Sequence, residues 1–169
     1  GMGVLDESTE IPGFYCSVGV AVSSDEGENW EKVGQLITSS KPKDWSSYEG
    51  QSDKGAGEPG AVLTKDGKYL YIYYTEHSRQ DNRGVQICMA RIPVDNFSLD
   101  NCKKYYNGEF SEPSISGKDT PVVSAKHMDD AEASFPHVVY SISLDKYIMI
   151  CNINFWKEYI NDTGLKNSG

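Results

Sequence analysis

The feature that most restricts the fold is the segment Ser23–Trp30, which reads SSDEGENW and lies between two short apolar runs. Asp25 can accept backbone N–H groups inside a turn, and Gly27 can adopt the positive φ that a tight turn needs. Ser23 can add a side-chain bond to the same turn, while Trp30 gives the returning strand a large apolar anchor. The pattern therefore predicts a β-hairpin near the N-terminus.

Short apolar runs separated by turn residues continue along the chain, and segments of helical period are scarce. The pair Asp66–Gly67 between two apolar runs is a strong hairpin signal. The expected strands are 18–22, 30–38, 59–64, 69–75, 84–92, 103–110, 135–140 and 146–154. The polar stretches 39–57, 76–83 and 111–133, the last with Asp119, are expected to be solvated surface loops. The chain is therefore expected to be all-β.

Composition excludes several classes of partner. The 169 residues contain 25 acidic and 16 basic side chains, a net charge of -9, and no basic cluster that could grip phosphates. Neither nucleic acid nor an anionic membrane is expected as a partner, and no apolar run reaches membrane-spanning length. The four cysteines are irregularly spaced, so no metal site is expected, and the compartment is left open.

Two of the expected hairpins resemble each other. Glu58–Pro59, a short strand and Lys68–Tyr69 match Phe135–Pro136, a short strand and Lys146–Tyr147, an internal repeat of roughly 75–80 residues. Repeated four-stranded units are typical of β-propellers. We therefore expect one partial propeller domain of about two four-stranded antiparallel blades, too few to close a ring. Its parts are an outer half-blade at 14–38, a full blade at 58–110 and an inner half-blade at 134–154.

These segments resemble parts of known carbohydrate-active propellers. Ser23–Trp30 resembles the Asp-box on the outer hairpins of sialidase blades, in which Asp25 would be structural. Gly55–Pro59 with 69–75 resembles the inner hairpin of five-bladed propeller glycoside hydrolases of the arabinofuranosidase and β-xylosidase type. Tyr105–Phe110 and Phe135–Val138 resemble segments of bacterial members of that superfamily. Because such enzymes are about twice as long, the resemblance implies a partial chain, whose parent would be periplasmic or secreted.

The resemblance also implies a chemistry, which is hydrolysis of a glycosidic bond by two carboxyl groups without a cofactor. In such propellers the catalytic carboxyls lie at the ends of the innermost strands. Glu58, immediately before an expected inner strand, is the catalytic candidate; its alternative role is to cap backbone amides of the loop. The corresponding position in the repeat is Phe135, so a second carboxyl would have to be Glu132 or lie outside this chain.

Four residues are candidates for binding the sugar. His77 and Arg79 follow an expected strand and could border a pocket, although a solvated loop is the favoured explanation of both residues. His137 lies inside an expected inner strand and is either pocket-facing or buried. Trp45, in the long loop, could stack on a sugar ring.

Two functional hypotheses follow from these residues. The chain is either glycoside hydrolase-like, acting on or binding carbohydrate, or a non-catalytic carbohydrate-binding or structural propeller module. A chain that begins with half a blade and ends with half a blade would also leave unpaired edges. We therefore expect a homo-oligomer in which the two halves complete each other.

Overall fold

The computed structural model describes residues 14–43, 53–78, 85–124 and 131–155. These residues form strands and one 3-10 turn, so the all-β expectation is confirmed in this part of the chain. The strands are β1 (Phe14–Cys16), β2 (Val18–Val22), β3 (Glu31–Ile37), β4 (Asp53–Leu63), β5 (Tyr69–Glu76), β6 (Gln86–Pro93), β7 (Lys103–Tyr106), β8 (Glu109–Pro113), β9 (Ala131–Ser141) and β10 (Lys146–Phe155); the turn η2 is Leu99–Asn101.

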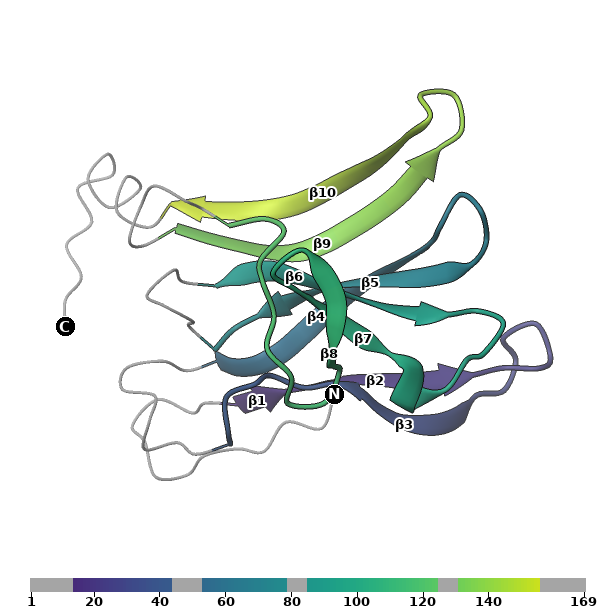
Figure 1. The fold of residues 1–169 in the computed structure, drawn as a ribbon, viewed down its shortest axis with the longest axis horizontal. Helices are drawn as coiled ribbons and strands as arrows, with labels where there is room; N and C mark the ends of the chain where they lie inside the picture. The colour runs from purple at the N-terminus through teal and green to yellow at the C-terminus, as the bar shows by residue number, and fades with distance from the viewer. Residues whose placement is uncertain (1–13, 44–52, 79–84, 125–130, 156–169) are drawn as a thin grey trace.

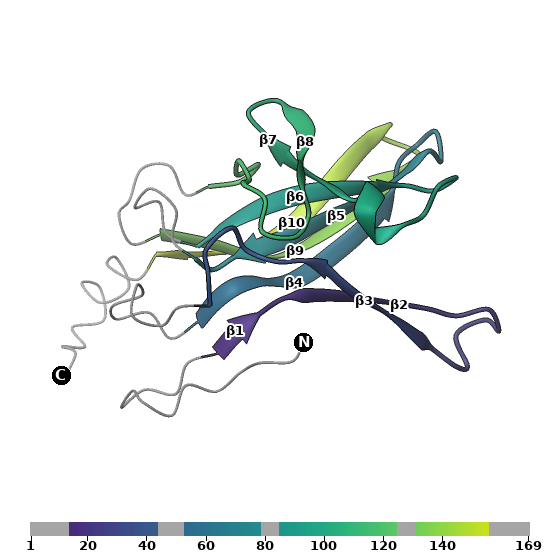
Figure 2. The same cartoon turned by 60° about the horizontal axis from the view of Figure 1, so that its bottom comes forward.

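The strands make three layers (Figure 1). The central sheet has the order β1-β4-β5-β6-β7-β8, and two-stranded sheets β2–β3 and β9–β10 lie along its two sides, as Figure 2 also shows. β4 to β7 form the antiparallel four-stranded meander expected for residues 58–110. The sheets do not close on one another within the described residues, so the assignment to a propeller remains a prediction.

The alternation of side chains along β5 explains the layers. Ile72 and Tyr74 point to one face and pack with residues from β2 and β3, whereas Thr75 points to the other and contacts Phe135 of β9. The main apolar core therefore lies between the central sheet and β2–β3. Its buried members are Val18, Leu36, Ile37, Ala56, Ile72, Tyr74, Cys88, Ala90, Ile92 and Cys102.

The repeat predicted from the sequence also appears in the strand register. Pairing in β4–β5 shifts between Gly57↔Thr75 and Gly60↔Tyr73, and pairing in β9–β10 shifts between Ser134↔Asn152 and His137↔Ile150. The spacing of about 77 residues is the same for each corresponding pair. Both bulges contain a residue of positive φ before a proline, Glu58 (φ 51°) and Phe135 (φ 54°).

Several local predictions were wrong. The expected solvated loop 76–83 begins with buried residues, since β5 extends to Glu76, and Glu76, His77 and Ser78 are buried. The expected loop 39–57 ends early because β4 begins at Asp53, where Lys54 and Ala56 are buried and β1 pairs with β4 in parallel. Such a parallel partner cannot be read from local polarity. The single strand expected at 103–110 is the hairpin β7–β8, since Asn107 and Gly108 both adopt positive φ. Asp119 is buried rather than solvated.

The N-terminal hairpin forms as predicted. The Asp25 carboxylate accepts the Ser23 hydroxyl at 2.6 Å and the Asn29 backbone N–H at 3.0 Å, and Gly27 has φ 92°. These bonds, the one from Ser23 above all, lower the pKa of Asp25 to about 2. Trp30 is exposed and donates its indole N–H to the Gly27 carbonyl at 2.9 Å, so the indole closes the turn instead of anchoring the core.

Candidate functional site

Glu58 lies in the bulge of β4 rather than just before the strand, and its carboxylate contacts His77. Glu58 Oε1 is 3.4 Å from His77 Nε2. The Glu58 side chain is 23% exposed, and His77 is buried. Glu58 Oε2 is buried and accepts no hydrogen bond of normal length from the described residues. The carboxylate is therefore mostly buried, and Oε2 is the oxygen that no donor satisfies at normal hydrogen-bond length among the described residues.

The surroundings of Glu58 favour its charged form. Burial raises the pKa of this carboxyl, but His77, the Thr75 hydroxyl and the Phe135 amide together outweigh burial, and the pKa lies below its ordinary value. The Thr75 hydroxyl is held in place because it accepts the Phe135 N–H at 3.1 Å. Glu58 is consequently ionised at neutral pH, as a base, a nucleophile or a hydrogen-bond acceptor must be.

Tight backbone packing holds His77 beside Glu58. The His77 N–H donates to the Gly55 carbonyl at 2.8 Å, and the Gly55 N–H donates to the Ser78 hydroxyl at 3.0 Å. A Cβ on Gly57 would lie 3.1 Å from the Cys16 Cβ and 3.6 Å from His77 Nε2. Glycine at residue 57 therefore lets β1 approach β4, whereas the imidazole would be in ordinary contact with a Cβ there.

Of the three predicted site residues that the structure describes, it brings Glu58 and His77 together. His137 is exposed on the outer face of β9, next to Ile150 of β10, so it is neither buried nor beside Glu58. Trp45 and Arg79 lie outside the described residues. Glu132, considered as a second carboxyl, is half-buried on β9 opposite Asn154.

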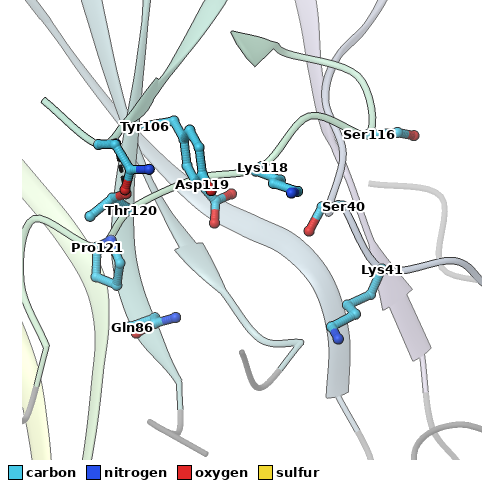
Figure 3. A pocket seen from close by; sticks show the side chains of 10 residues that line it. Ser40, Lys41, Gln86, Tyr106, Ser116, Lys118, Asp119, Thr120 and Pro121 are labelled. Atoms are coloured by element: carbon cyan, nitrogen blue, oxygen red, sulfur yellow. Dashed lines mark hydrogen bonds between the residues drawn. The ribbon is translucent and has the colours of Figure 1, made fainter. Parts of the chain in front are cut away.

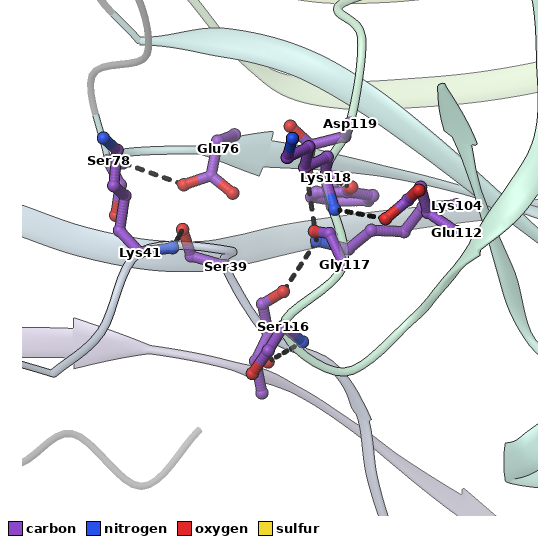
Figure 4. Close-up of polar contacts among 12 residues, drawn as sticks. Ser39, Lys41, Glu76, Ser78, Lys104, Glu112, Ser116, Gly117, Lys118 and Asp119 are labelled. Carbon is purple, nitrogen blue, oxygen red and sulfur yellow. Dashed lines mark hydrogen bonds and ion pairs between the residues drawn. The ribbon is translucent and has the colours of Figure 1, made fainter. Parts of the chain in front are cut away.

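A buried polar cluster on the other face of β5 was missed from the sequence (Figure 4). Lys104 Nζ lies 3.1 Å from Asp119 Oδ2 and donates to the carbonyls of Thr38 at 2.7 Å and Gly117 at 2.9 Å. The Tyr74 hydroxyl donates to the same Asp119 oxygen at 2.8 Å. The five groups come from four separate segments of the chain, and of these Gly117 and Asp119 were expected in a solvated loop.

Glu76 belongs to this cluster and has the opposite protonation preference to Glu58. Burial, followed by the nearby charge of Asp119, raises the pKa of Glu76 to about 8 despite Lys104. Its Oε1 accepts the Ser78 N–H at 2.9 Å. Two carboxyls with divergent pKa values are typical of acid–base pairs. Glu76, however, has no exposed surface and lies on the side of β2–β3, so it does not reach a substrate held by Glu58.

A polar cavity of about 560 Å³ opens beside this cluster (Figure 3). Lys118 and Ser40 point toward its interior, and Asp119, whose side chain is buried, lies in its wall. Gln86, in β6, forms part of its wall; its Oε1 is buried and accepts no hydrogen bond from the described residues. The remaining lining residues are Lys41, Tyr106, Asn107, Ser116, Thr120 and Pro121. The lining therefore offers both donors and acceptors to a small polar ligand.

Neither a metal cluster nor a membrane helix is found in the described ranges. No group of three or more His, Cys, Asp or Glu side chains converges there, and no helix there is long and apolar enough to cross a bilayer. All four cysteines are free thiols.

Comparison with known proteins places this chain in no family. No family model matches the sequence, no curated protein matches it, and no solved structure matches the fold.

Proposed function

We propose that this chain acts on or binds carbohydrate as part of a glycoside hydrolase-like β-propeller, with Glu58 as the carboxylate that meets the sugar. One observation supports this most directly: Glu58 is ionised, partly exposed and held 3.4 Å from His77 at a bulge between two layers. A charged carboxylate beside an imidazole can accept hydrogen bonds from sugar hydroxyls or remove a proton from water. His77 orients that carboxylate.

Hydrolysis also requires a second carboxyl group as the general acid. The groups around Glu58 are His77, the Thr75 hydroxyl and the Phe135 amide, and none of them is a carboxyl. Glu58 therefore has the role of base or nucleophile in this proposal, and the acid has to come from a different part of the complete site.

Turnover of a panel of aryl glycosides tests the catalytic form of the proposal. Glu58→Gln keeps the shape of the side chain and removes its charge, so turnover should fall by about 100-fold or more. The matched control is Glu109→Gln, which changes an exposed glutamate of β8 and should leave turnover unchanged. Turnover that survives Glu58→Gln would remove Glu58 from the mechanism.

The second candidate function is carbohydrate binding without catalysis, and the cavity beside Gln86 favours it. Its wall contributes amide, hydroxyl and ammonium groups, and Gln86 Oε1 lacks a donor that a sugar hydroxyl would supply. Titration of the labelled protein with monosaccharides, followed by NMR, separates the candidates. Shifts at the Gln86 amide without turnover support binding alone, whereas shifts near Glu58 together with turnover support hydrolysis.

A further inference from the structure

One face of the β9–β10 hairpin carries exposed aliphatic side chains that no other described element covers. Val139 pairs with Ile148, and Ile150 is the next residue of β10 on that face, opposite His137. These three aliphatic side chains are 47%, 37% and 71% exposed, in contrast to Val138, which points to the opposite face and is buried. Contiguous exposed apolar residues on a sheet mark a surface that another element covers.

The internal repeat identifies the kind of element that fits this face. The positions that correspond to His137↔Ile150 and Val139↔Ile148 are Gly60↔Tyr73 and Val62↔Tyr71 in β4–β5. That face of β4–β5 is covered by β9, since a Cβ on Gly60 would lie 2.2 Å from the Pro136 carbonyl oxygen. The exposed face of β9–β10 is thus the repeat of a face that a β-sheet already covers in this molecule.

The strand order shows which edge is incomplete. β9–β10 corresponds to β4–β5. In the central sheet β5 is followed by β6 and then β7, whereas β10 has no further strand beside it among the described residues. β2–β3 is the other two-stranded sheet of the molecule, and the edge of β2 is also unpaired in the described part. Joined edge to edge, β9-β10-β2-β3 would have the same four-stranded antiparallel order as β4-β5-β6-β7.

The position of β2 allows β10 of another copy to pair with its edge without a clash between the layers. β2 contacts β4, and β3 contacts η2, so the unpaired edge of β2 lies on the side of β4. A hairpin joined to that edge would continue over the face of β4 that carries Ala61 and Leu63. Ala61 is exposed and Leu63 is 50% exposed, so this part of the face too has no cover among the described residues.

We propose that a second copy of this chain supplies the missing layer: β10 of one copy pairs with β2 of the next, and Val139, Ile148 and Ile150 pack on Ala61 and Leu63 of that copy. Both uncovered apolar faces are buried by this one contact. The contact is heterologous, because different surfaces of the two copies meet, and it therefore builds a ring or an open chain. It depends on neither candidate function.

Light scattering coupled to size exclusion tests the assembly over a range of concentrations. We expect wild type to have at least twice the mass of the chain, and Ile150→Lys to have the mass of a monomer with an unchanged circular dichroism spectrum. The matched control is Ile142→Lys in the β9–β10 turn, where the side chain is 87% exposed but off the face, and it should assemble like wild type. A wild-type monomer, or assembly that survives Ile150→Lys, would overturn the proposal.

A mixing experiment tests the direction of the contact. Val22→Lys places a charge on the exposed end of β2 and should also give a monomer. Ile150→Lys retains an intact β2 edge, and Val22→Lys retains an intact β9–β10 face. An equimolar mixture of the two should therefore form a heterodimer, visible as a doubling of mass. A mixture that stays monomeric, or Val22→Lys that still assembles, would contradict the pairing of β10 with β2.

Discussion

The carbonyl oxygen of Pro136 lies so close to Gly60 that a Cβ on residue 60 would be only 2.2 Å from it. This contact joins β9 to β4 next to both β-bulges, where Glu58 and Phe135 adopt positive φ. The absence of a side chain at residue 60 therefore sets the distance between two layers, and with it the place of the Phe135 amide beside Glu58.

Gly60→Ala should separate these layers and lower the free energy of unfolding by more than about 2 kcal/mol, because the obstacle is backbone and cannot rotate away. Gly19→Ala is the matched control, since the nearest atom to its Cβ is the Gly34 carbonyl oxygen at 3.5 Å, an ordinary contact. Urea unfolding of both variants gives the comparison. Equal stability of the two variants would show that β4 and β9 do not approach as described.

Lys104→Met should destabilise the protein by about 3–5 kcal/mol, because it leaves the Asp119 carboxylate buried without its cation. Lys104 and Asp119 have no exposed side-chain surface. The Lys104 ammonium also donates hydrogen bonds to the carbonyls of Thr38 and Gly117. Lys68→Met removes the exposed Lys68–Asp66 pair, 3.7 Å apart, and should change the stability by less than about 1 kcal/mol. Thermal unfolding that ranks the two variants in the reverse order would be inconsistent with the buried pair.

Glu76 should make the protein less stable as the pH rises. Its pKa is raised from 4.5 to about 8 by folding, so between these values the folded state binds more protons than the unfolded state and the free energy of unfolding falls with pH. Glutamine resembles the protonated carboxyl. The free energy of unfolding of Glu76→Gln, relative to that of wild type, should consequently increase as the pH rises from about 5 to about 9.

Urea titrations at the two pH values measure this difference, with Glu109→Gln as the exposed control. A difference between wild type and Glu76→Gln that is independent of pH would exclude a raised pKa for Glu76.

Asp25→Ala should disorder the β2–β3 turn while the core remains folded, because the Asp25 contacts are with Ser23 and Asn29 in the same turn. The NMR resonance of the Trp30 indole N–H, which is bonded to the Gly27 carbonyl, reports on the turn. Acidification should have the same effect: the contribution of Asp25 is present above its ordinary pKa of 3.8 and is lost as the pH falls toward about 2. An unchanged Trp30 resonance in Asp25→Ala would refute this role.

The sequence by itself was sufficient for features whose contacts are local. The bonds of Asp25 reach residues no further away than Asn29, so the residue pattern of Ser23–Trp30 contains nearly everything that its turn needs. The repeat of Glu58–Pro59 and Phe135–Pro136 was also visible, since two equal bulges require similar residues. Short apolar runs separated by turn residues, such as Asp66–Gly67, likewise predicted a meander of antiparallel strands in this part of the chain.

The candidate site depended on contacts that no local pattern contains. Glu58 meets His77 because the register of β4 against β5 places them together, and the amide of Phe135 reaches them from β9, far along the chain. In the sequence Lys104 and Asp119 are ordinary charged residues. In the structure the segment after β8 lies against β7, and both side chains are fully buried. Burial and long-range pairing are properties of the assembled layers, so only the tertiary structure decided which charges are paired, which carboxyl is ionised and which apolar face is left uncovered.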